Sequence, residues 1–118
     1  MNFLDVIVVG AGQAGLSVAY FLRRTRRSVV LLDAEQQGGG AWQHAWDSLR
    51  LFSPAQWSSI AGWPMPDSGV TYPHRDDVVD YLRRYEQRYQ FDIRRLVQVT
   101  DIVPVAGGFR VVSAQQHW

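Results

Sequence analysis

Three glycines near the start of the chain have the spacing of a phosphate-binding loop. Gly10, Gly12 and Gly15 form the pattern G-x-G-x-x-G. In such a loop the first glycine permits a tight turn, the second lets the backbone approach a pyrophosphate, and the third allows close helix–strand packing. The N–H groups and the dipole at the start of a helix favour a bound diphosphate. Because glycine-rich turns are common, only the context makes this pattern specific.

Asp33 is the acidic residue that this chemistry calls for. It ends a second apolar run and follows Gly15 at close to the spacing of about 20 residues that dinucleotide-binding units show. A carboxylate at this place accepts hydrogen bonds from the ribose hydroxyls of an adenosine and repels a 2′-phosphate. The sequence therefore predicts a dinucleotide with an unphosphorylated adenosine ribose, FAD or NAD, and argues against NADP at this loop.

The elements that must position these residues follow from hydrophobic periodicity. Apolar runs predict buried strands over residues 3–9 and 28–32, and helical spacing predicts a helix over residues 16–24 between them. A parallel pair joined in this way requires a right-handed crossover. The first third of the chain is therefore predicted to be a β-α-β unit in an α/β fold.

The second half of the chain is predicted to hold one long helix and three short strands. Residues 75–89 place Val78, Leu82, Tyr85 and Tyr89 on one helical face, after a start signal of Pro73, Asp76 and Asp77. Residues 91–96 predict a third parallel strand. Residues 97–105 and 109–113, on either side of Ala106-Gly107-Gly108, predict a β-hairpin.

Residues 34–73 differ from the rest of the chain and favour FAD over NAD. This segment begins with an expected flexible turn at Gly38–Gly40 and continues with prolines and four of the five tryptophans. We expect loops and short helical turns here. The tryptophans form either an aromatic cluster over one side of the sheet or a surface that packs against a bound ring system or another piece of protein. A second glycine turn and a long Trp-Pro loop suit an elongated FAD better than NAD.

At these residues the sequence resembles the N-terminal part of the flavin-dependent monooxygenases of the two-dinucleotide-binding-domain type, within the pyridine nucleotide–flavin oxidoreductase superfamily. The resemblance is carried by GAGQAG at 10–15, GGAW at 39–42, WDSLRLFSP at 46–54, GWPMP at 62–66 and the segment 72–85. It implies a partial Rossmann-like FAD-binding domain over residues 1–118. It also implies that FAD is held by Gly10, Gly12, Gln13, Ala14, Gly15, Asp33, Gly40, Trp42 and the backbone of Val99. In such enzymes NADPH reduces the flavin, and the reduced flavin activates O₂ to oxygenate a substrate.

The sequence also departs from that family. Its members are much longer and carry a second glycine motif for NADPH, which has no counterpart here, and their next strand would begin at Gln115. We therefore expect a truncated domain with little oxygenase activity of its own, and we assign no catalytic residue. The alternatives are a non-catalytic NAD- or FAD-binding module, a non-functional truncated product, or part of an NAD dehydrogenase.

Composition limits the other classes of function. Lys+Arg 12 against Asp+Glu 11 gives a formal charge of +1, which favours neither nucleic acid nor an anionic membrane as a partner. The chain has no cysteine, and His44, His74 and His117 lack the spacing of metal ligands, so no metal site is predicted. No apolar run is long enough to span a membrane, and the default expectation is a cytoplasmic location.

Overall fold

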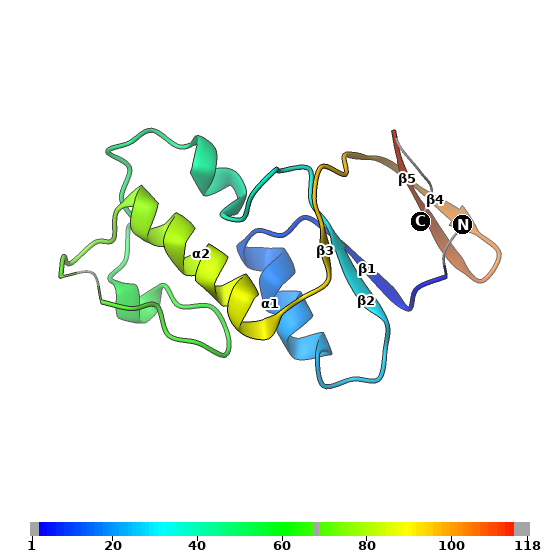
Figure 1. Ribbon diagram of the computed structural model, residues 1–118, viewed down its shortest axis with the longest axis horizontal. Coiled ribbons are helices and arrows are strands. Elements are labelled where there is room, and N and C mark those ends of the chain that lie inside the picture. Colours follow the sequence, from blue (N-terminus) through cyan, green and yellow to red (C-terminus); the bar gives the residue numbers. More distant parts are fainter. Residues whose placement is uncertain (1–2, 68, 115–118) are drawn as a thin grey trace.

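A parallel sheet of three short strands forms the middle layer of the computed structural model, which describes residues 3–67 and 69–114 (Figure 1). Strand β1 (Val6–Val9) pairs in parallel with β2 (Val29–Leu32), and β2 pairs in parallel with β3 (Ile93–Arg94), in the order β1-β2-β3. The predicted β-α-β unit and the predicted third parallel strand are both confirmed.

The two faces of β2 pack against different layers. Leu31 belongs to the larger core, which lies on the side of the sheet covered by the helices. Val30 and Leu32 point to the opposite face and pack with Val111 of the hairpin. Because side chains alternate along a strand, a run that is apolar at every position is buried on both faces. Figure 1 shows the helices and the hairpin on opposite sides of the sheet.

Helix α1 (Gln13–Leu22) connects β1 and β2 and begins three residues before the predicted start. The predicted start lies too far along the chain because the second half of the glycine loop, residues 13–15, already forms the first turn of the helix. The helix ends at Leu22, whose carbonyl accepts hydrogen bonds from the Thr25 N–H (3.0 Å) and the Thr25 hydroxyl (2.7 Å). The predicted extension to Arg24 is therefore wrong, since Thr25 satisfies the last turn.

Helix α2 (Arg75–Tyr89) has the predicted bounds. The Asp77 carboxylate accepts a hydrogen bond from the His74 N–H (3.0 Å), which closes the first turn. The helix ends where Gln90 adopts the left-handed conformation, with φ 51°. The buried residues of α2 are Val78, Val79, Tyr81, Leu82 and Tyr85.

Strand β1 is shorter than the predicted run over residues 3–9. The Asp5 N–H donates to the Ser28 hydroxyl (2.8 Å), and the Ser28 N–H donates to the Asp5 carboxylate (2.8 Å). These side chains replace the backbone ladder at this end of the strand pair. Hydrophobic periodicity does not reveal such side-chain hydrogen bonds to the backbone, so the sequence could not predict the shorter strand.

The segment between β2 and α2 contains two short 3₁₀ helices, η1 (Gly40–His44) and η2 (Ala55–Trp57), and no long element, as predicted. Three tyrosine hydroxyls on α2 hold part of this segment. Tyr81 donates to the carbonyl of Trp63 (2.6 Å), Tyr85 to that of Ala61, and Tyr89 to that of Gly62 (2.6 Å). We call Tyr81, Tyr85 and Tyr89 the tyrosine ladder.

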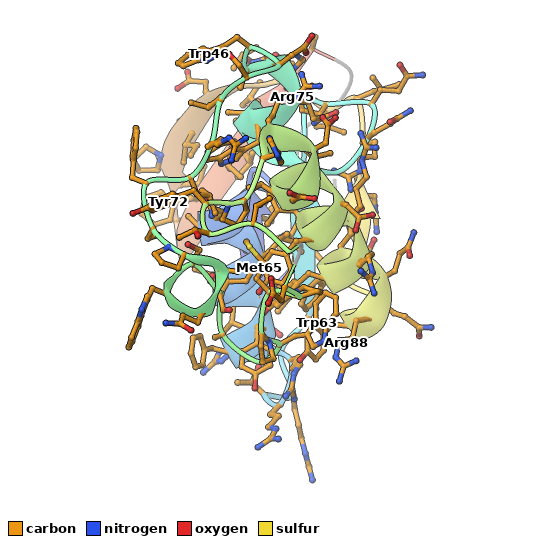
Figure 2. The ribbon with its side chains drawn as sticks, turned by 90° about the vertical axis from the view of Figure 1, so that its left-hand side faces the viewer. Trp46, Trp63, Met65, Tyr72, Arg75 and Arg88 are labelled. Carbon is orange, nitrogen blue, oxygen red and sulfur yellow. The ribbon has the colours of Figure 1, made fainter. Side chains whose placement is uncertain are left out.

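The tryptophans of this segment do not form the single cluster that was one of the two expectations. Trp63 stacks on Tyr81 with ring centroids 5.3 Å apart and lies beside Arg88 (Figure 2). Trp46 and Trp57 are 66% and 75% exposed. The ring cluster is instead built by tyrosines of α1 and α2, because these project from helices that face each other.

Strands β4 (Val99–Val105) and β5 (Gly108–Ser113) form the predicted antiparallel hairpin, with Gly107 at φ 84° in the turn. The strand expected to begin at Gln115, and His117, lie outside the described residues. Within residues 3–67 and 69–114, no helix has the length and apolar character needed to cross a membrane.

Candidate dinucleotide-binding site

The glycine loop joins the carboxyl end of β1 to the start of α1. Gly10 has φ 100°, a conformation that favours glycine, and its N–H donates to the Leu32 carbonyl (2.7 Å). A Cβ atom at Gly15 would lie 2.1 Å from the Gly10 carbonyl oxygen, so helix and loop touch backbone to backbone. A Cβ atom at Gly12 would approach only the Gly40 Cα, at 3.9 Å, so the space beside Gly12 is open. The structure thus confirms the turn at Gly10 and the close packing at Gly15 that their spacing predicts, and the approach of a pyrophosphate to Gly12 stays a prediction.

The start of α1 is suited to an anion. Its N-cap is Gly12, no side chain caps the helix, and no acidic residue lies in the first turn. The N–H groups of this turn have no intrahelical acceptors. Together with the helix dipole, they favour a negatively charged group in front of the loop.

The Gly38–Gly40 turn is packed in place, which corrects the expectation that it is flexible. A Cβ atom at Gly38 would lie 2.8 Å from the Glu86 carboxylate, and one at Gly40 would lie 3.0 Å from the Gly12 Cα. The Gly38 carbonyl also accepts a hydrogen bond from Arg83 Nε (2.9 Å). Gly38 thus packs against the Glu86 side chain of α2, and Gly40 packs against Gly12 of the first loop. Gly39 and Gly40 also have positive φ, at 116° and 54°, a conformation that favours glycine.

Two neighbouring cavities lie along the glycine loop and share Val9, Gly10, Gly12, Gly40 and Ala41. One, of about 300 Å³, lies over the start of α1. The other, of about 330 Å³, extends toward the end of β2 and the start of β4. Every predicted site residue lines one or both cavities: Gly10, Gly12, Gln13, Ala14, Gly15, Asp33, Gly40, Trp42 and Val99. The structure thus brings all nine together.

Asp33 lies at the wall of the second cavity and is 5% exposed. Its carboxylate is paired with Arg95, and Arg95 also pairs with Glu86 of α2. Burial opposes the charge on Arg95, but its hydrogen bonds to Glu86 and Asp33 outweigh that effect, so its pKa is raised. Sequence reasoning missed Arg95 and Glu86, because nothing in their spacing relates them to Asp33.

Glu35 and His44 also line the second cavity, and sequence reasoning did not assign them to the site. Glu35 accepts hydrogen bonds at both carboxylate oxygens from His44 Nε2, at 2.8 and 2.9 Å. Glu35 follows the predicted acid by two positions, so its place beside the ribose-binding residue could have been found from the strand-end rule. The contact with His44 could not, because it depends on the fold of the glycine turn.

The arrangement has a definite chemical capacity. The first cavity offers backbone N–H groups and no carboxylate, which suits a diphosphate. The second offers the carboxylates of Asp33 and Glu35 and the peptide groups of residues 97–99, which suit hydroxyl and amino donors. Because Gly12 lines both cavities, the pair suits a ligand with a diphosphate in the first cavity and an adenosine in the second.

Comparison with known proteins supports this interpretation. The sequence matches the model of the FAD dependent oxidoreductase family over residues 5–116. The structure is similar to a flavin-containing monooxygenase from Stenotrophomonas maltophilia, with a TM-score of 0.96 and 52% sequence identity, over 100% of this chain and 36% of that chain.

Two curated proteins extend the comparison. A CzcO-like oxidoreductase of Geobacillus kaustophilus is 33% identical over 112 residues, which are 95% of this chain and 32% of that protein. An indole-3-pyruvate monooxygenase of Arabidopsis thaliana is 34% identical over 89 residues, covering 75% of this chain and 21% of that protein. This chain thus spans about a third or less of the length of these relatives. The resemblance to flavin-dependent monooxygenases is confirmed, and the chain belongs to the FAD-dependent oxidoreductase family.

Proposed function

We propose that the two cavities along the glycine loop bind FAD. The observation that carries the proposal is the open space beside Gly12, between a helix start without a side-chain cap and a wall that bears Asp33. The diphosphate would lie at the start of α1 and the adenosine in the second cavity. The ribose hydroxyls would donate to Asp33, and the backbone of Val99 would face the adenine.

The family supports FAD as the dinucleotide. Trp42 and Leu82 also line the first cavity, beside the proposed diphosphate position. This additional apolar wall suits a cofactor such as FAD, which continues beyond its diphosphate. Bound FAD supplies redox chemistry at its flavin ring. The described residues of this chain bind and orient its adenosine diphosphate part.

We further propose that the chain supplies the FAD-binding part of an NAD(P)H-dependent flavoprotein monooxygenase. The support is the 52% identity to a flavin-containing monooxygenase. A steroid monooxygenase that is 25% identical to this chain has been solved bound to NADP, which supports a nicotinamide nucleotide as the reductant of the proposed enzyme.

The proposal is tested by titrating the purified chain with FAD and with NAD, with calorimetry and flavin absorbance as the measurements of binding. We expect saturable FAD binding and much weaker NAD binding. Gly12→Ala should abolish FAD binding while leaving the thermal unfolding curve unchanged, since a methyl group there meets only the Gly40 Cα at 3.9 Å and projects into the space needed by the diphosphate.

Gly108→Ala is the matched control for this experiment. A Cβ atom at Gly108 meets no atom within 4 Å, and Gly108 lies in the hairpin away from both cavities. Its FAD affinity should equal that of the wild type. A wild-type chain that binds NAD and no FAD would refute FAD binding and support the alternative of an NAD-binding module.

A further inference from the structure

Arg95 forms a charged bridge with Asp33, which lines the second cavity, and with Glu86 of α2. One guanidinium nitrogen, Nη1, donates to Asp33 Oδ2, and the other, Nη2, donates to Glu86 Oε1. The three side chains are 21%, 7% and 17% exposed, respectively. A single cation is thus held between two carboxylates that come from the end of β2 and from α2, with little access to water.

The backbone around Arg95 keeps this bridge in one geometry. The Asp33 N–H donates to the Arg94 carbonyl (2.9 Å), and the Val97 N–H donates to the Asp33 carbonyl (2.9 Å). Arg95 therefore lies in a stretch that is hydrogen-bonded to Asp33 on both sides. Leu96, in the left-handed conformation at φ 59°, makes the turn between these two bonds.

The bridge leaves Asp33 with acceptor capacity for a ligand in the cavity. Arg95 donates to Oδ2, and an ionised carboxylate has about four lone-pair sites, so Asp33 can hold Arg95 and still accept a hydrogen bond from a ligand. A guanidinium stays charged at any physiological pH and has donors in a fixed planar arrangement. It therefore holds the neighbouring carboxylate in one orientation better than water or a lysine would.

On the basis of the proposed FAD binding, we infer that Arg95 is a positioning residue for recognition of the adenosine ribose by Asp33. With Arg95 replaced by an uncharged side chain, Asp33 and Glu86 lose their common partner and repel each other, and Asp33 is free to turn away. The effect should fall on the contact with the ribose hydroxyl and not on the diphosphate or the flavin.

The test compares FAD with its analogue that carries 2′-deoxyadenosine, by calorimetric titration of the flavin-free chain. A hydrogen bond to a charged group corresponds to about a tenfold difference in affinity or more, so the wild type should prefer FAD by at least about tenfold. In Arg95→Met, FAD affinity should fall about tenfold, while affinity for the deoxy analogue should change little. Arg95→Lys should give an intermediate preference, because a lysine retains the charge and can reach one carboxylate.

Arg84→Met is the matched control, because Arg84 pairs with Asp80 at the exposed surface of α2 and lines neither cavity. It should keep the wild-type preference. An equal loss of affinity for both ligands in Arg95→Met, or no loss for either, would refute the inference while leaving FAD binding intact. If Arg95→Met does not fold, Arg95→Lys provides the test. A preference of Arg95→Lys for FAD over the deoxy analogue that equals the wild-type preference would also refute the inference.

A ligand-free measurement separates this inference from the proposed function. The denaturant midpoints of Asp33→Asn, Arg95→Met and the double variant should be non-additive, which shows that the pair exists without flavin. Additive shifts would overturn the inference even if FAD binds. A wild type that binds neither ligand would refute the proposed function, and Arg95 would then be only a structural link, which also overturns the inference.

Discussion

At the scale of single residues, glycines of the site are required for two different reasons. Gly15 and Gly38 have close protein neighbours, so a side chain there would displace protein atoms. Gly12 has open space beside it, so a side chain there would displace a ligand instead. The distinction between folding and binding roles can therefore be tested with the same substitution at different positions.

Gly15→Ala should destabilise the folded chain. Its Cβ atom would lie 2.1 Å from the Gly10 carbonyl oxygen, a backbone atom that can move only if the loop moves. Overpacking of this kind costs about 1–3 kcal/mol of unfolding free energy. Urea denaturation measures the loss, with Gly12→Ala as the control that keeps wild-type stability. Equal stability of both variants would show that the loop tolerates the displacement.

Leu96→Gly should stabilise the folded chain by about 0.5–1 kcal/mol. Leu96 is 62% exposed, so its side chain contributes little packing, and its φ of 59° is unfavourable for leucine. Glycine removes that strain, partly offset by its greater entropy in the unfolded state. Leu96→Ala keeps the strained conformation and should not stabilise. Chemical denaturation of both variants decides, and a gain in the alanine variant would contradict the explanation.

At the scale of elements, α2 organises most of the site. Its buried face packs against α1 and the sheet, Glu86 contacts both Arg95 and the Gly38 turn, and the tyrosine ladder holds residues 61–63. A long helix can do this because side chains four positions apart lie on one face. Contacts with α2 thus hold the irregular segment after β2 in place, in addition to its own two short 3₁₀ helices.

The tyrosine ladder should make stability sensitive to alkaline pH. Burial raises the pKa of Tyr85 above its ordinary value of 10.0, as do the neighbouring Tyr89 and Tyr81. Since the folded state keeps a proton that the unfolded state loses, this contribution is fully present below about pH 10 and is lost as the pH rises further.

Tyr85→Phe tests this expectation through urea unfolding between pH 7 and pH 11. At pH 7 it should lose about 1 kcal/mol, because the Ala61 carbonyl loses its donor. Above pH 10 the difference from the wild type should shrink. Tyr72→Phe, a change at a half-exposed ring, is the control and should follow the wild type throughout. A difference that is constant across this range would contradict a raised pKa.

At the scale of the whole molecule, the described residues form an elongated body. The Cα radius of gyration is 15.6 Å, against about 13–14 Å for a compact domain of this length. In the described part of the chain, β1 is an edge strand, and a groove of about 450 Å³ separates it from the hairpin. Exposed apolar side chains line this groove, among them Phe3, Ile102, Val105 and Phe109.

This groove should bind a hydrophobic dye such as anilinonaphthalene sulfonate. The double variant Ile102→Lys with Phe109→Lys should reduce dye fluorescence while changing the unfolding free energy by no more than about 0.5 kcal/mol, since both side chains are exposed. Phe21→Lys, at an equally exposed ring of α1 outside the groove, is the control. Dye binding that survives in the double variant would place the apolar surface elsewhere.

The sequence by itself determined the local features: the spacing of Gly10, Gly12 and Gly15, the bounds of α2, the β-hairpin and the acid at Asp33. Each of these features depends on neighbouring residues or on hydrophobic periodicity, so a short stretch of the sequence is enough to predict it. Only the tertiary structure decided that Arg95 pairs with Asp33, while its neighbour Arg94 pairs with Asp92, and that the Gly38 turn is packed rather than flexible. These contacts join residues far apart in the sequence, and their partners are fixed by the packing of α2 against the sheet, which no local pattern specifies.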